Sequence, residues 1–207
     1  MGRWGHRLFE GDSDIDIACE LNEILPSKHI NLSDMVHQTD MMAPQEARDY
    51  YQTPDYKFEL ASTITTIRRR LDSGLGDQIM AKCREKEAES GAMEIWDPRY
   101  KTVLAAALIM RAGARIKADH VQHLKDIVPQ ITCNYGFTLP FCDQGFRYPG
   151  KLQFLAALDN YVPGTPRNFE VPSCFACSKI EADVGAPLKK CSHCKKVWYC
   201  NKVGLRK

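Results

Sequence analysis

Apolar residues recur at helical spacing through most of the first 170 residues. A first stripe predicts a helix that Asp12 or Ser13 caps and that Pro26 ends. A second stripe predicts a longer helix, which Ser73-Gly74 is expected to stop. The stripes consist of Ile17, Leu21, Ile24 and Leu25 in the first helix and of Phe58, Leu60, Ile64, Ile67 and Leu71 in the second.

The most apolar segment of the chain predicts a central helix. Asp97 is a favoured N-cap residue, and Pro98 fits the first helical turn because its missing N–H has no intrahelical partner there. Residues 103–110 are almost continuously apolar, and Gly113 follows as the expected end. A helix that is apolar on most faces is buried, so we expect other helices to surround this one.

Three further helices complete the prediction. They cover residues 77–90, 118–128 and 150–160, and residues 131–149 are predicted to be irregular. The first is charged on most faces, and Ile79, Met80 and Cys83 are expected to attach it to the core. The predicted fold class is mainly α. Its parts are a helical domain at residues 1–162, a linker with Pro and Gly at 163–173, and a small C-terminal module at 174–207.

Charge divides the chain at the same place. Residues 174–207 contain eight Lys and Arg against two Asp and Glu, a net charge of +6, whereas residues 1–173 carry −4. Hydrophobic residues make up 44% and charged residues 26%, as in soluble globular proteins. No apolar run is long enough for a membrane span, and no secretory signal is apparent. We therefore expect an intracellular chain without membrane association, in either nucleus or cytoplasm.

The N-terminal residues form a patterned stretch of their own. The Trp4-Gly5 start and the acidic residues after it resemble the opening of a small bacterial and fungal family of unknown function, which implies no activity. Asp12, Asp14 and Asp16 also resemble part of a calcium loop. Such a loop needs glycine at its sixth position, where this chain has Ile17. We interpret the three aspartates as helix-capping and surface residues.

Nine cysteines require an explanation, because disulfides are rare inside cells. Five of them lie within residues 174–200, as the ligands of a metal site would. The other four are far apart in the sequence, and an isolated intracellular cysteine is usually a small buried apolar residue. We predict that role for Cys19, Cys83, Cys133 and Cys142.

The crowded cysteines are spaced as zinc ligands are. Cys174-x-x-Cys177 and Cys191-x-x-Cys194 are separated by thirteen residues, and Cys200 follows within six. A Cys-x-x-Cys turn places two thiolates on one side of a tight bend, as a tetrahedral Zn²⁺ requires. Nearby basic residues lower thiol pKa values and help to balance the thiolate charge. The pattern predicts structural zinc binding by these five cysteines.

The segment from Cys191 to Lys202 resembles the most recognisable part of a MYND-type zinc finger. That family holds two zinc ions in a cross-braced pattern. The combination with a helical N-terminal domain also resembles uncharacterised fungal proteins. The resemblance implies that one ion is shared by Cys174, Cys177 and Cys200, and that the other is bound by Cys191 and Cys194 with later residues.

The resemblance ends after Lys202. The family has a further cysteine where this chain has Gly204, and its last His and Cys would follow Lys207. We therefore expect a truncated finger, from a real isoform or a gene-model error, with at most one Zn²⁺, since structural sites use four ligands. Two arrangements stay open: a partly disordered tail, or one ion held by Cys174, Cys177, Cys191 and Cys194.

MYND fingers bind short, often proline-containing peptides around a structural zinc. The resemblance therefore implies an adaptor with a protein or peptide partner. The alternative is a nucleic-acid-associated regulator that uses the basic tail to neutralise phosphates. An enzyme is not expected, because common nucleophile, phosphate-loop and dinucleotide motifs are absent, as are the motifs of methyltransferases with a MYND insert. His120 and His123 are expected to have packing or surface roles. Neither a particular partner nor an oligomeric state is indicated.

Overall fold

The structure, a computed structural model, describes residues 5–23, 31–36, 44–89, 97–134 and 145–201. It is mainly helical, which confirms the predicted fold class. No helix among these residues is long and apolar enough to cross a membrane. Its α-helices are α1 (Asp12–Glu23), α2 (Gln45–Tyr51), α3 (Pro54–Arg70), α4 (Gly76–Glu89), α5 (Pro98–Ala112), α6 (Ala118–Ile127), α7 (Tyr148–Asp159) and α8 (Glu181–Val184).

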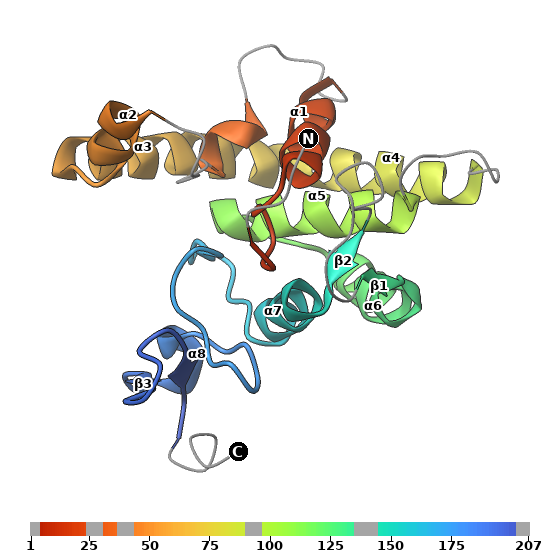
Figure 1. Cartoon of the computed structure of the whole chain (residues 1–207). Helices are drawn as coiled ribbons and strands as arrows, with labels where there is room; N and C mark the ends of the chain where they lie inside the picture. The colour runs from red at the N-terminus through yellow and green to blue at the C-terminus, as the bar shows by residue number, and fades with distance from the viewer. Residues whose placement is uncertain (1–4, 24–30, 37–43, 90–96, 135–144, 202–207) are drawn as a thin grey trace.

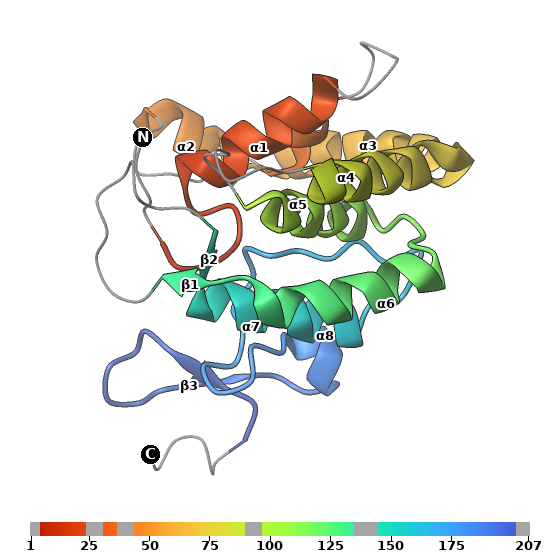
Figure 2. The ribbon, with the colours of Figure 1, turned by 90° about the vertical axis from the view of Figure 1, so that its right-hand side faces the viewer.

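The helices form layers around α5. In Figure 2, α1, α3 and α4 lie on one side of α5, and α6 and α7 lie on the other. The C-terminal module lies beyond α7, far from α3 and α4 (Figure 1). A short 3₁₀ helix, η1 (Leu32–Met35), packs against α1, α3 and α5. The module therefore lies on the side of the helical layers that α7 occupies.

The central helix α5 confirms the prediction made from its sequence. The Asp97 carboxylate accepts a hydrogen bond from the Arg99 N–H at 3.0 Å, as an N-cap does. At the other end, Gly113 has φ +76°, the left-handed conformation that glycine adopts without steric strain. Between these ends, the side chains from Thr102 to Ala112 are buried. This helix therefore forms the core on which both layers pack.

The helices α3 and α4 meet at a wide turn, η2 (Leu71–Leu75). Gly74 has φ +109° there, and α4 departs in a different direction (Figure 2). The α-helix ends at Arg70, and the helical path breaks at Gly74, where the sequence predicted a stop. The assignment of Phe58 to the apolar stripe is wrong, because its side chain is 78% exposed. Phe58 precedes the buried Ile64 by six residues, a rotation of about 240°, which turns it away from α5.

The segment predicted to be irregular contains two short strands. β1 (Cys133–Asn134) pairs in parallel with β2 (Phe146–Arg147) after a 3₁₀ turn, η3 (Val128–Gln130); residues 135–144 are outside the described part. The ring of Phe146 packs edge-on against Tyr100 of α5, with 5.0 Å between centroids. It also lies 6.3 Å from Phe154 of α7. These aromatic contacts attach α7 to the central helix.

The acidic N-terminal residues are not all on the surface. Asp14 is fully buried, which corrects the sequence interpretation for this residue. Its carboxylate accepts hydrogen bonds from the Phe9 N–H and the Tyr100 hydroxyl, each at 2.8 Å. A buried carboxylate needs such donors to replace lost hydration. Asp14 therefore joins the N-terminal loop, α1 and α5, whereas Asp16 is exposed as predicted.

The segment before the cysteines is held to the end of α5. The Gly164 N–H donates to the Gly113 carbonyl, and the Arg167 N–H donates to the Met110 carbonyl, each at 2.8 Å. The Arg167 side chain is buried and forms a two-fold ion pair with Asp183 of α8. The C-terminal module is therefore attached to the helical layers through residues of the predicted linker. The placing of domain boundaries at 163 and 173 stays a prediction.

The prediction that the isolated cysteines are buried has a different outcome at each position. Cys83 is buried, and burial raises the pKa of its thiol to about 11. Cys133 is partly buried, and Cys142 lies outside the described residues. Cys19 is exposed, so the prediction of burial is wrong there. Cys19 follows the fully buried Ala18 in α1, and one residue turns a helix by about 100°, enough to reach the solvent face.

Candidate metal centre

Each Cys-x-x-Cys pair forms the same kind of turn. In the first, the Ser178 N–H donates to the Cys174 carbonyl at 2.8 Å, and in the second the Lys195 N–H donates to the Cys191 carbonyl at 3.0 Å. Ser178 and Lys195 both adopt positive φ, 57° and 54°. This conformation is uncommon for residues other than glycine. The backbone therefore curls tightly around each cysteine pair, as expected from their spacing.

A short hairpin brings Cys200 to the first pair. β3 (Lys189–Lys190) and β4 (Trp198–Tyr199) are antiparallel, with Lys190 opposite Trp198. On its other side, Trp198 forms a bridge with Cys174, and the Phe175 N–H donates to the Trp198 carbonyl at 2.7 Å. Cys200 lies two residues beyond Trp198, and its thiol therefore lies beside the first cysteine pair.

Three thiols lie close together beside the first cysteine turn. The sulfur atoms of Cys174, Cys177 and Cys200 all lie within 4.8 Å of one another. The Cys177 and Cys200 sulfurs are 3.8 Å apart. Two thiolates at about 2.3 Å from a tetrahedral zinc are separated by about 3.8 Å. The arrangement of the donors therefore fits Zn²⁺.

The electrostatics of the cluster also suit a cation. Burial opposes ionisation of Cys174, but N–H groups of Cys200, Cys177 and Ala176 directed at its sulfur lower its pKa to about 7. The hydrogen bond with Cys174, followed by burial and the Cys177 thiol, raises the pKa of Cys200 to about 11. Neighbouring thiolates repel each other. A bound cation removes that penalty by accepting all three as ligands.

The second pair lies apart from this cluster. The three-thiol group includes neither Cys191 nor Cys194, and it is the single such group found in the described part of the chain. Cys191 and Cys194 contact each other, and N–H groups of Lys196 and Val197 lower the pKa of Cys194. Cys174, Cys177 and Cys200 are the set that the resemblance implies for one ion. The alternative of one ion between the two pairs is not the arrangement in this structure.

A cleft lies between the first turn and the helical layers. Its volume is about 330 Å³. Most of its lining is apolar, and two of its aromatic side chains, Tyr148 (46% exposed) and Phe175 (69%), are open to solvent. Its lining includes Arg7 of the N-terminal loop, Tyr148 and Leu152 of α7, and Phe175, Lys196 and Trp198 of the C-terminal module. No pattern in the sequence predicts this cleft, because its walls are far apart in the chain.

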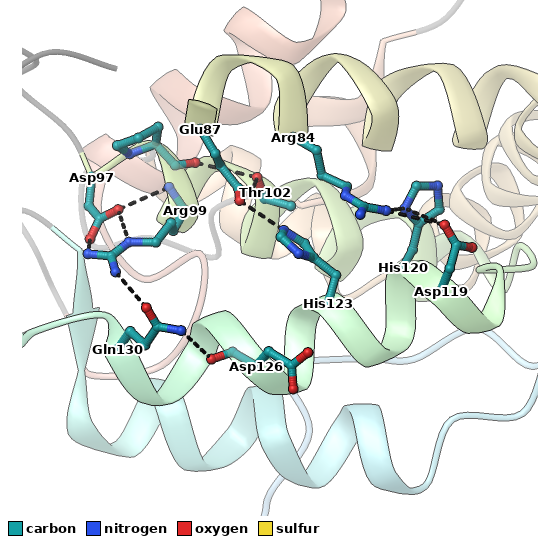
Figure 3. Close-up of polar contacts among 11 residues, drawn as sticks. Arg84, Glu87, Asp97, Arg99, Thr102, Asp119, His120, His123, Asp126 and Gln130 are labelled. Carbon is teal, nitrogen blue, oxygen red and sulfur yellow. Dashed lines mark hydrogen bonds and ion pairs between the residues drawn. The ribbon is translucent and has the colours of Figure 1, made fainter. Parts of the chain in front are cut away.

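The histidines belong to a polar network between α4, α5 and α6, drawn in Figure 3. His123 Nε2 lies 2.8 Å from a Glu87 carboxylate oxygen, and the Thr102 hydroxyl donates to the same carboxylate. His120 Nδ1 lies 3.1 Å from the Arg84 guanidinium. Burial is the largest of the effects that lower the pKa of His120. Both histidines therefore pack helices together, as predicted, and neither belongs to a group of three metal ligands in the described residues.

Comparison with family models, with curated proteins and with solved structures found no match for this chain. The candidate site therefore rests on the geometry of its own residues.

Proposed function

We propose that the C-terminal module binds one structural Zn²⁺ and that the protein is an adaptor for a protein or peptide partner. The observation that carries this proposal is the mutual approach of the Cys174, Cys177 and Cys200 sulfurs within 4.8 Å. Three thiolates at this separation supply three of the four ligands that zinc prefers. Cys191 and Cys194 contribute to the fold of the same module through the second turn.

The role proposed for the metal is structural rather than catalytic. The cluster joins the first cysteine turn to β4. Few backbone hydrogen bonds otherwise connect these two elements. Small modules of this kind gain most of their folding free energy from metal binding. The metal therefore holds Phe175 and Trp198 beside the cleft, where a partner can contact them.

The alternative is association with nucleic acid. The observation that favours it is the exposure of Lys189, Lys190, Lys195 and Lys196 on one small module. Lysines that neutralise phosphates make binding weaken steeply as salt rises. Binding that falls more than about tenfold between 50 and 200 mM salt, with an oligonucleotide as probe, would favour this alternative over peptide recognition.

Zinc content tests the main proposal. We expect elemental mass spectrometry on the reduced, purified protein to find about one zinc per chain. Cys200→Ser should reduce the content to near zero, because two thiolates rarely hold a structural zinc. Cys191→Ser is the matched control and should keep about one zinc. Circular dichroism should show that the helical layers persist in both variants.

The opposite pattern would contradict the assignment. Zinc that is lost in Cys191→Ser and kept in Cys200→Ser would mean that the two pairs share one ion. A wild-type chain that binds no zinc under reducing conditions would end the proposal altogether.

A further inference from the structure

The cleft beside the metal centre combines apolar walls with positive charge. Leu152 and Tyr148 of α7 form one wall, and Phe175 and Trp198 of the module form the other. The charged residues that line it are Arg7 and Lys196, and among its described lining residues none is Asp or Glu. Exposed apolar surface of this kind typically marks an interaction site. The cleft therefore suits an anionic segment that also has an apolar side chain.

The two walls are held at a fixed separation. The Arg7 guanidinium donates to the Glu170 and Val171 carbonyls at 3.3 and 3.2 Å. Gln153 of α7 is buried, and its amide donates to the Phe169 carbonyl at 2.6 Å. These contacts join the N-terminal loop and α7 to the chain just before the first cysteine turn. The cleft is therefore preformed, which reduces the entropic cost of binding.

The aromatic side chains in the module's wall of the cleft are positioned to hold a side chain of a partner. The Phe175 ring packs edge-on against Tyr199 with 6.2 Å between centroids, which fixes its orientation although 69% of Phe175 is exposed. The Lys190 ammonium lies 5.4 Å from the Trp198 ring centroid. Phe175 and Trp198, with Lys190 near Trp198 and Lys196 in the lining, favour an aromatic or aliphatic anchor flanked by carboxylates.

We propose that this cleft binds an acidic peptide segment of a partner protein. One aromatic or aliphatic side chain of the peptide enters between Tyr148 and Phe175, and a flanking Asp or Glu pairs with Lys196. The inference rests on the proposed adaptor function, and it assigns the binding surface to both the module and α7. A nucleic acid is disfavoured here, because the lining is mainly apolar and includes only Arg7 and Lys196 to neutralise phosphates.

Peptide selection tests the proposal. The zinc-loaded full chain is presented with a random twelve-residue peptide display library, and the most enriched peptides are synthesised with a fluorescent label. We expect peptides with net negative charge and one aromatic or leucine residue. Phe175→Ser, Tyr148→Ala and Lys196→Glu should each weaken binding by about tenfold or more. Reversing the peptide's acidic residues to lysine should abolish it.

Two control variants match these changes outside the cleft. Phe58→Ala removes an aromatic residue on α3 that is even more exposed than Phe175, and Lys189→Glu reverses an exposed lysine of β3. Both should change affinity by less than about twofold, which is typical for residues outside an interface. Zinc content should equal that of the wild type in all five variants, since none is a metal ligand.

The outcomes separate the two proposals. Zinc binding without enrichment of acidic peptides would overturn the cleft assignment and leave the metal centre intact. Enrichment of neutral or basic peptides, or an equal loss for Lys189→Glu and Lys196→Glu, would also overturn it. A single-stranded oligonucleotide of twenty nucleotides and mixed sequence serves as competitor. If it displaces the peptide with an affinity similar to that of the peptide itself, the surface would be assigned to nucleic acid instead. Acidic-peptide binding by a chain without zinc would support the cleft and refute the proposed metal dependence.

Discussion

Arg167→Met is expected to destabilise the folded chain by about 3–5 kcal/mol, because removing one partner of a buried ion pair leaves the other charge uncompensated. The side chains of Arg167 and Asp183 are only 6% and 3% exposed. Asp183 also accepts the Ile180 N–H at 2.9 Å, so it is needed at the start of α8. The loss can be measured by urea unfolding at a fixed zinc concentration.

A double variant separates two contributions to this loss of stability: the missing ion pair and the unpaired buried charge that remains. Arg167→Met combined with Asp183→Leu should be less destabilised than Arg167→Met alone, because no unpaired charge remains. Arg115→Met is the matched control. Its partner is Asp72, but the Arg115 side chain is 73% exposed, and a surface pair contributes about 0–1 kcal/mol. Equal effects of Arg167→Met and Arg115→Met would show that the buried pair is not what attaches the module.

Asp14→Ala is expected to cost about 2–6 kcal/mol of the free energy of unfolding. The substitution leaves the buried Phe9 N–H and Tyr100 hydroxyl without their acceptor, and each unsatisfied buried donor costs about 1–3 kcal/mol. Thermal unfolding followed by circular dichroism provides the measurement. Because Asp14 is distant from the cysteines in the sequence and in its contacts, zinc content should not change.

Asp16→Ala provides the comparison for this prediction. Asp16 lies two residues later in the same helix and is exposed, so the change should stay within about 0.5 kcal/mol. A loss of stability for Asp16→Ala as large as that for Asp14→Ala would assign the effect to the charge of the helix start rather than to the buried carboxylate.

The parts of the fold that depend on local chemistry could be predicted from the sequence. Asp97-Pro98 and Gly113 define the ends of α5, and an apolar run between them has one physical outcome, which is burial. Asp14 shows the limit of this reasoning. Its acidic neighbours suggested a solvated helix start, whereas its burial depends on Tyr100, which is 86 residues away. No local pattern shows such a partner.

The candidate site was predictable to the same extent. Spacing identifies Cys174 with Cys177 and Cys191 with Cys194, because each pair needs one turn. The spacing does not show which of the two cysteine pairs lies beside Cys200. That choice depends on the pairing of β3 with β4 and on the bridge between Trp198 and Cys174. The cleft was not predictable, since its walls come from α7 and from the module, which are apart in the sequence.

The attachment of residues 164–167 to the end of α5 has a consequence for turnover in a cell. Through the Gly113 and Met110 carbonyls, α5 holds the segment that leads into the module. A ligand that binds only the folded state stabilises everything that unfolds together with its site. Under the proposed zinc binding, metal supply therefore sets how often the module and the segment attached to it open to proteases. A shortage of zinc would lower the abundance of the protein before any partner was involved.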